Sequence, residues 1–149
     1  MNLLETWLVP FVVATVASLS FGVIFQVQRS RLLLCGLVGG CGWLARVAAE
    51  QLGWQIVGWT LLGALVVGCL GEVLARVLRE PATLFLTPGI VPLVPGATTF
   101  AAMQAFVVGD YTQGLSLTTA ALLAAGAIAA GLAIATPLVR GSFGLLRRR

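Results

Sequence analysis

The residues best suited to bind a small polar molecule lie in a proline-rich segment of the chain. Three prolines and two glycines occur within nine residues there: Pro88, Gly89, Pro92, Pro95 and Gly96. Each proline removes a backbone N–H, and its ring clashes with the carbonyl four residues earlier. A helix through this segment is therefore predicted to break, with its first half ending near Thr87 and its second half beginning near Gly96.

The start of the second half-helix is a predicted anion site. The first N–H groups of a helix lack intrahelical acceptors and lie at the positive end of its dipole. Thr98 and Thr99 add hydroxyl groups in that turn, and the two glycines allow backbone conformations closed to other residues. We expect these prolines, glycines and threonines of residues 88–99 to bind a small carboxylate, as broken helices do in many transporters. The alternative is a packing kink, because membrane helices tolerate proline.

Two charged side chains inside apolar runs are further candidates. Arg46 lies about five residues, or roughly 7 Å, from the end of its run. It is predicted either to bind the substrate carboxylate or to snorkel to the interface and pair with Glu50. Glu72 precedes Arg76 by four residues, which is the favourable order for a helical ion pair. It is predicted either as a structural partner of Arg76 or as the residue that couples transport to protons.

The composition shows which solvent surrounds the elements that hold these residues. Hydrophobic residues make up 59% of the chain, charged residues 9%, and the mean hydropathy is +1.03. An ordinary soluble domain is about 45–50% apolar and about 25% charged. The bilayer must therefore surround most of the chain. The basic charge is arginine alone, in small groups between apolar runs, which excludes a nucleic-acid-binding surface.

Uncharged runs predict five membrane spans in one domain that covers residues 1–149. A spanning helix needs about 20 mainly apolar residues, and continuous apolar runs are not typical of barrel strands. The sequence thus predicts an all-α polytopic membrane protein with about five transmembrane helices, the fourth broken by prolines. The expected spans are residues 6–28, 32–51, 54–76, 82–109 and 114–139.

The arginines predict how these spans are oriented. Five spans place eight arginines on one side of the membrane, and Glu5, Glu50, Asp110 and Arg46 on the other. Positive charge gathers on the cytoplasmic side, so we expect the N-terminus outside and the C-terminus inside the bacterial cytoplasmic membrane. The eight are Arg29, Arg31, Arg76, Arg79, Arg140, Arg147, Arg148 and Arg149. Gly36 and Gly40 form a G-x-x-x-G pattern that predicts close helix packing.

Enzyme chemistry is not indicated by the sequence. The chain has no histidine, no P-loop signature and no cluster of carboxylates. Its cysteines, Cys35, Cys41 and Cys69, match no metal or redox spacing. We therefore expect no catalytic residues, no metal and no cofactor. The expected partners are membrane lipid, a small carboxylate substrate and other protein subunits, including a second copy of the chain.

Two segments resemble the threonine/serine exporter family. They are residues 21–46, with the arginine pair and the glycine-rich run that follows it, and Pro-Gly-Ile-Val-Pro-Leu-Val-Pro-Gly at residues 88–96. The resemblance extends over nearly the whole chain, whose length and layout are similar to the family's small, C-terminal-half subunit. It implies secondary active export of threonine and serine, or of succinate in a two-subunit version.

The resemblance also implies a partner. The other half of such an exporter has a cytoplasmic N-terminal domain followed by about five spans. A competing interpretation is a scaffold or assembly subunit of another membrane complex, which the small size and many small-residue faces would also suit.

Overall fold

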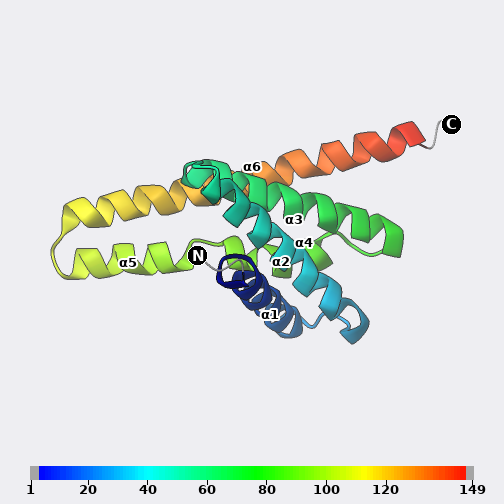
Figure 1. Cartoon of the computed structure of the whole chain (residues 1–149), viewed down its shortest axis with the longest axis horizontal. Helices are drawn as coiled ribbons and strands as arrows, with labels where there is room; N and C mark the ends of the chain where they lie inside the picture. The colour runs from blue at the N-terminus through cyan, green and yellow to red at the C-terminus, as the bar shows by residue number, and fades with distance from the viewer. Residues whose placement is uncertain (1–3, 147–149) are drawn as a thin grey trace.

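The computed structural model describes residues 4–146. Within that range the chain consists of helices joined by short turns, with no β-strand. Among these described residues, four helices are long and apolar enough to cross a membrane, and a fifth span results if a bent pair of shorter helices counts as one. The predicted all-α polytopic fold is thereby confirmed. In chain order the elements are η1 (Leu4–Leu8), α1 (Val9–Ile24), α2 (Arg29–Gln51), α3 (Ile56–Leu78), α4 (Thr83–Ile90), η2 (Val91–Leu93), α5 (Gly96–Val107) and α6 (Tyr111–Leu146) (Figure 1).

Small residues bring α1 and α2 into close contact. A Cβ on Gly36 would lie 3.0 Å from the Thr15 carbonyl oxygen, and one on Gly40 would overlap the Thr15 hydroxyl. A Cβ on Gly39 would likewise overlap the hydroxyl of Ser18, which is fully buried. In lipid, such small residues let two backbones approach and gain van der Waals contact. The G-x-x-x-G pattern of α2 therefore packs against α1, a partner that the pattern itself did not specify.

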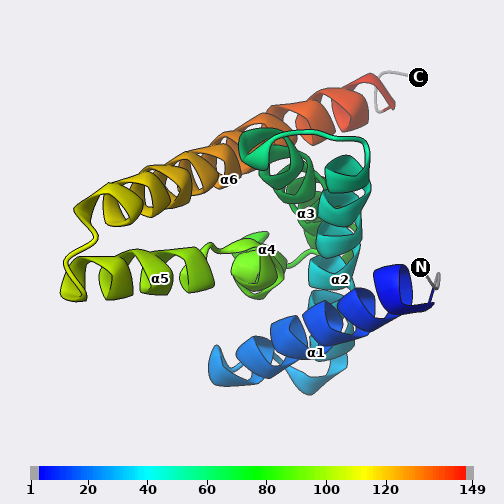
Figure 2. The same ribbon diagram turned by 60° about the vertical axis from the view of Figure 1, so that its left-hand side comes forward.

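The same principle joins α3 to α6, which run side by side in the same direction (Figures 1 and 2). A Cβ on Gly131 of α6 would lie 2.8 Å from the Cβ of Ala64, and one on Gly68 of α3 would overlap the Cβ of Ala135. Larger side chains at these positions would push the helices apart. Both helices also contribute polar residues to the two sites described below.

The fourth span is broken, but later than the sequence indicated. The prediction that its first half ends near Thr87 is wrong, because α4 continues through Pro88 to Ile90 and is extended by the 3-10 turn η2. Pro92 and Pro95 do remove the i+4 donors of the Pro88 and Val91 carbonyls. Those carbonyls instead accept i+3 bonds, from Val91 N and, at 3.3 Å, from Val94 N.

The tighter turn delays the break to residues 94 and 95, where the chain leaves the helix. The part before the break and the part after it differ in direction by 47°. Val94 is extended and α5 begins at Gly96. The prediction that the glycines adopt special backbone conformations is also wrong, since neither Gly89 nor Gly96 has a positive φ. Gly89 instead allows close packing, because a Cβ there would lie 2.9 Å from Val38.

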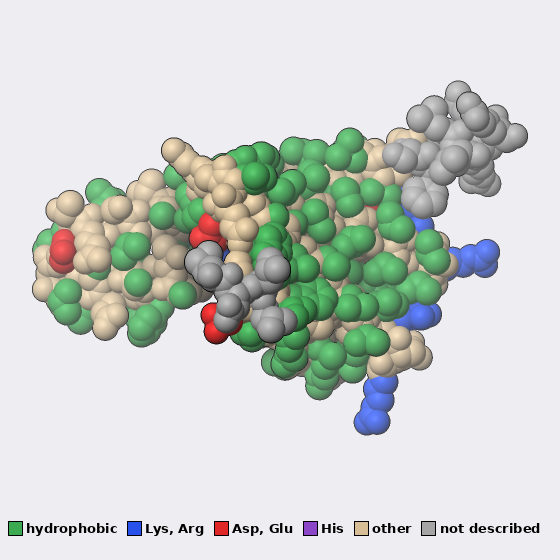
Figure 3. Space-filling view, viewed as in Figure 1, with side chains coloured by type: hydrophobic (Ala, Val, Ile, Leu, Met, Phe, Trp, Pro, Cys, Tyr) green, Lys and Arg blue, Asp and Glu red, His purple; other side chains and the backbone are tan. Residues whose placement is uncertain are grey.

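Apart from Arg46, the basic side chains of the described residues gather at one end of the bundle, which we call the arginine end (Figure 3). Arg29 and Arg31 begin α2 there, and Arg79 ends α3 in a left-handed conformation. The two turns are tied by an ion pair of 3.7 Å between Arg31 and Glu80. Arg147, Arg148 and Arg149 lie outside the described residues, so the structure places six of the nine arginines of the sequence.

A helical hairpin projects from the opposite side of the bundle. It consists of α5 and the first half of α6, and it extends beyond α1, α2 and α3 (Figures 1 and 2). Its tip turns through Gly109, at φ +86°, and Asp110, whose carboxylate accepts a hydrogen bond from Gln113 N at 3.0 Å. The hairpin exposes many large apolar side chains, among them Phe100, Met103, Val107, Tyr111, Leu115 and Leu122.

Candidate functional site

A pocket of about 160 Å³ lies where the fourth span breaks. It is bounded by η2 and the start of α5 on one side and by α2, α3 and α6 on the others. Four residues that the sequence marked as binding candidates line it: Arg46, Pro92, Pro95 and Thr98. The structure therefore brings the arginine of α2 next to the helix break, although about fifty positions separate them in the chain.

Arg46 is held in this pocket by aromatic rings. Its guanidinium carbon lies 4.2 Å from the ring centroid of Trp43 and 5.6 Å from that of Trp59. Both distances are within the range of a cation–π interaction. Its nitrogen also lies 3.9 Å from a Glu50 carboxylate oxygen, which is an ion pair but too long for a hydrogen bond. The side chain is 22% exposed, so its charge is partly desolvated and its N–H donors can meet an anion.

The first turn of α5 adds uncharged donors. The first bond of this helix runs from Thr99 N to Pro95 O at 3.0 Å, and Gly96 N bonds to Val94 O at 2.8 Å. The N–H groups of Ala97 and Thr98 precede that first intrahelical bond, and both residues line the pocket. Such groups carry the positive end of the helix dipole. Arg46 and the start of α5 thus place positive potential on two sides of one small cavity.

Three pocket residues were not identified as binding candidates from the sequence. Trp43, Trp59 and Thr60 line the cavity, and Thr60 is only 3% exposed although it is polar. The ring of Trp59 faces the Arg46 guanidinium from α3. The indole N–H of Trp43 is buried without a hydrogen-bond partner among the described residues. The spacing of three between Trp43 and Arg46, which puts both on one helix face, was an available signal.

The other binding candidates of the fourth span do not line this pocket. Pro88 and Gly89 are buried in the packing of α4 against its neighbours. Gly96 has nothing within 4 Å of the position where a Cβ would be. The Thr99 hydroxyl donates to Pro95 O at 2.8 Å, and Thr99 lines a separate, largely apolar groove between α5 and α6. Thr98 and Thr99 therefore face different cavities.

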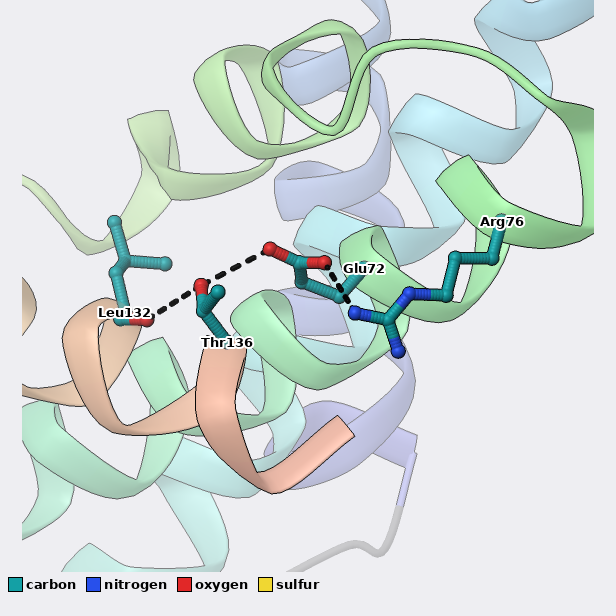
Figure 4. A network of polar contacts seen from close by, with 4 residues as sticks. All are labelled: Glu72, Arg76, Leu132 and Thr136. Carbon is teal, nitrogen blue, oxygen red and sulfur yellow. Dashed lines mark hydrogen bonds and ion pairs between the residues drawn. The ribbon is translucent and has the colours of Figure 1, made fainter. Parts of the chain in front are cut away.

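Glu72, the coupling candidate, belongs to a second polar cluster on α3 (Figure 4). It is 8% exposed, and Arg76 donates to its carboxylate at 3.3 Å. The hydroxyl of Thr136 on α6 donates to the other carboxylate oxygen at 3.0 Å. Glu72 lies twelve residues after the pocket residue Thr60 on the same helix, or roughly 18 Å at 1.5 Å per residue.

These features define a class of protein. Apolar helices long enough to cross a bilayer, together with a polar pocket at a helix break and a buried charged cluster, are typical of a multi-pass membrane transporter. The chain belongs to the threonine/serine exporter family: the family described as "Threonine/Serine exporter, ThrE" matches residues 10–138. The matched region includes both polar sites. No solved structure matches the chain.

Proposed function

We propose that this protein is a subunit of a secondary active exporter whose substrates are small carboxylates, namely threonine and serine or dicarboxylates such as succinate. Membership of the exporter family supports the transport class. The main support for the proposal is the pocket at the helix break, which Arg46 and the first turn of α5 line together. The carboxylate group is the chemical feature that all these substrates share.

The pocket contains two kinds of hydrogen-bond donor for a bound carboxylate. The guanidinium of Arg46 can bind both oxygens of the carboxylate in a planar fork. The backbone amides of Ala97 and Thr98 can donate to the same carboxylate from the other side of the pocket. The hydroxyls of Thr60 and Thr98 are placed for the remaining polar groups of a hydroxyamino acid. Charge-assisted hydrogen bonds of this kind contribute about 1.5–3 kcal/mol each.

An exporter must also release its substrate, and Glu50 gives a physical route to release. Its carboxylate lies 3.9 Å from the Arg46 nitrogen and competes with the substrate for the same positive charge. The ring faces of Trp43 and Trp59 also stabilise that charge through cation–π contacts. Arg46 therefore binds an anion less tightly than an unpaired buried cation would.

The proposal includes a partner and a location. The apolar surface of the α5–α6 hairpin supports contact with further membrane helices, which we assign to a second exporter subunit with a cytoplasmic N-terminal domain and about five spans. A second copy of this chain is the other candidate for that surface. The clustered arginines support the cytoplasmic membrane of a bacterium, with the N-terminus outside and the C-terminus inside.

Efflux measurements test this function directly. Cells that lack the gene are loaded with labelled threonine, serine or succinate, and export is compared with that of the parent and of a complemented strain. We expect slower export of at least one substrate, restored by the wild-type gene and not by an Arg46→Gln variant present at equal amounts in the membrane. Unchanged efflux of all three compounds would refute the proposed substrate class.

A further inference from the structure

Glu72, Arg76 and Thr136 form a buried polar cluster that the proposed substrate pocket does not include. A carboxylate inside a membrane-spanning helix is costly unless it is paired, and such groups are rare. A hydrophobic contact between α3 and α6 would hold these helices together at no such cost. The cluster lies on the same two helices that form walls of the substrate pocket, through Trp59 and Thr60 on α3 and Ala124 on α6.

The hydroxyl of Thr136 has two acceptors within reach. It donates to Oε1 of Glu72 at 3.0 Å, and the carbonyl oxygen of Leu132 lies 3.5 Å away on its own helix (Figure 4). A threonine hydroxyl has one hydrogen to donate and lone pairs to accept with. It can therefore donate to a carboxylate, or accept from a carboxylic acid while its own hydrogen turns to Leu132 O.

We propose that Glu72 is the proton-carrying residue of the exporter; this inference rests on the proposed transport function. In the charged state, Glu72 accepts from Thr136 and from Arg76. A proton from water on one side of the membrane then forms an O–H bond at the carboxyl group, which donates to Thr136 Oγ1. Later this O–H bond breaks and the proton passes to water on the other side. Arg76 keeps its own proton throughout.

The hydrogen bond between α3 and α6 exists in both states but reverses its direction. What changes is the ion pair: a neutral Glu72 has no charge to attract Arg76, although its second oxygen can still accept a hydrogen bond from the guanidinium. The Arg76 side chain is 25% exposed and close to the arginine end, so its charge stays partly solvated when Glu72 is neutral. The carboxyl group can thus be charged or neutral without leaving a buried polar atom unpaired, which a coupling residue requires and a purely structural pair does not.

The charged surroundings of Glu72 are simple. Among the described residues its one ion-pair partner is Arg76, on its own helix. On α6, Arg140 follows Thr136 by one turn and is exposed at the arginine end. On the α2 and α4 sides, Arg31 of α2 and Glu80, which precedes α4, pair with each other at 3.7 Å.

A local weakness of α6 connects the cluster to movement. Pro137 follows Thr136 directly and removes the backbone donor that would bond to the Ala133 carbonyl. Proline is a common cause of helix bending. A change in the contact between Glu72 and Thr136 therefore acts next to a missing backbone hydrogen bond of α6, the helix that also reaches the pocket through Ala124.

The test compares two kinds of transport in membrane vesicles from the native host, with the substitution placed in the chromosomal gene. The first assay measures threonine, serine and succinate movement driven by a pH gradient. The second measures exchange of labelled for unlabelled substrate without any gradient. For Glu72→Gln we expect gradient-driven transport to fall by about tenfold or more, because the coupled step is lost, while exchange stays within about twofold of wild type.

Thr136 supplies a matched pair of variants. Thr136→Ser keeps the hydroxyl and should transport as wild type does, whereas Thr136→Val should slow gradient-driven transport more than exchange.

A third measurement, chemical labelling of the carboxyl group, needs no variant. Dicyclohexylcarbodiimide reacts with protonated carboxyl groups in apolar surroundings, so mass spectrometry of the wild-type protein should show Glu72 modified more in acidic than in alkaline buffer.

The outcomes separate this inference from the proposed function. Wild-type rates of gradient-driven transport in Glu72→Gln would overturn the coupling role and leave the exporter intact. Equal loss of exchange and driven transport, with Glu72 unmodified by the carbodiimide, would make the cluster a structural pair. Wild-type vesicles that move none of the three substrates in either assay would overturn the proposed function, and the coupling role with it.

Discussion

The guanidinium of Arg46 lies 4.2 Å from the ring of Trp43, one helical turn earlier on α2. Trp59 of α3 approaches the same group at 5.6 Å. The aromatic faces hold the cation without using its N–H donors, which lie in its plane. Arg46 is thereby oriented before any substrate arrives, so little side-chain entropy remains to be lost on binding.

Substitution of Arg46 should therefore impair transport in a graded way. Arg46→Gln loses the charge, and we expect kcat/KM to fall by about ten- to a hundredfold, equivalent to about 1.5–3 kcal/mol. Arg46→Lys keeps the charge but loses the planar fork, so an intermediate value is expected. Initial rates in vesicles, corrected for protein amount by immunoblot, provide the measurement. Normal transport by Arg46→Gln would show that the residue serves only its pair with Glu50.

The adjacent threonines of α5 offer an internal comparison. Thr98 lines the pocket at the helix break, whereas the Thr99 hydroxyl is already bonded to Pro95 O and Thr99 lines the separate groove between α5 and α6. We expect Thr98→Val to raise the apparent KM by about two- to tenfold, because one neutral hydrogen bond is worth about 0.5–1.5 kcal/mol. Thr99→Val should leave KM unchanged, and Thr98→Ser should restore it. An equal effect of both valine variants on KM would argue against the pocket as the binding site.

Reporter fusions test the orientation. Fusions after Arg31 and after Arg79 should report a cytoplasmic position, as should one at the C-terminus, whereas fusions near Gly53 and Asp110 should report the outside. The reason is that positive charge at membrane-flanking turns stays on the cytoplasmic side. An insertion of two arginines at Gly53 should weaken this pattern. A C-terminus outside the cytoplasm would contradict the five-span arrangement.

The helices could be predicted from the sequence because they follow from local properties. Uncharged runs of spanning length predicted the long helices, and the prolines predicted that one span is broken. The position of the break could not be predicted in the same way. Pro92 and Pro95 remove i+4 donors, but the i+3 bond from Val94 N to Val91 O carries the helix one turn further. That choice depends on how η2 packs against its neighbours, and local sequence does not determine it.

The candidate site was predictable only in part for a related reason. Arg46 and Thr98 were conspicuous because charge and hydroxyl groups are rare in apolar runs. Arg46 and Thr98 lie in one pocket because α2 crosses the broken span. That crossing could not be predicted from the sequence around either residue. Trp59 and Thr60 were missed because an aromatic or a threonine near a helix start has many ordinary explanations. Small residues likewise predicted close contact without identifying which helices meet.

The last prediction uses two glycines of very different surroundings. Gly39 lies against α1, where a Cβ would overlap the Ser18 hydroxyl and come within 3.2 Å of the Gly89 carbonyl, whereas a Cβ on Gly96 meets nothing within 4 Å. Overfilling a close contact costs about 1–3 kcal/mol. We expect Gly39→Ala to lower the Tm of the purified protein in detergent by several degrees, and Gly96→Ala to leave both Tm and transport unchanged. Equal Tm values for the two variants would mean that α1 and α2 do not pack through Gly39. A loss of transport in Gly96→Ala, at normal Tm, would show that the start of α5 closes more tightly during export than it does here.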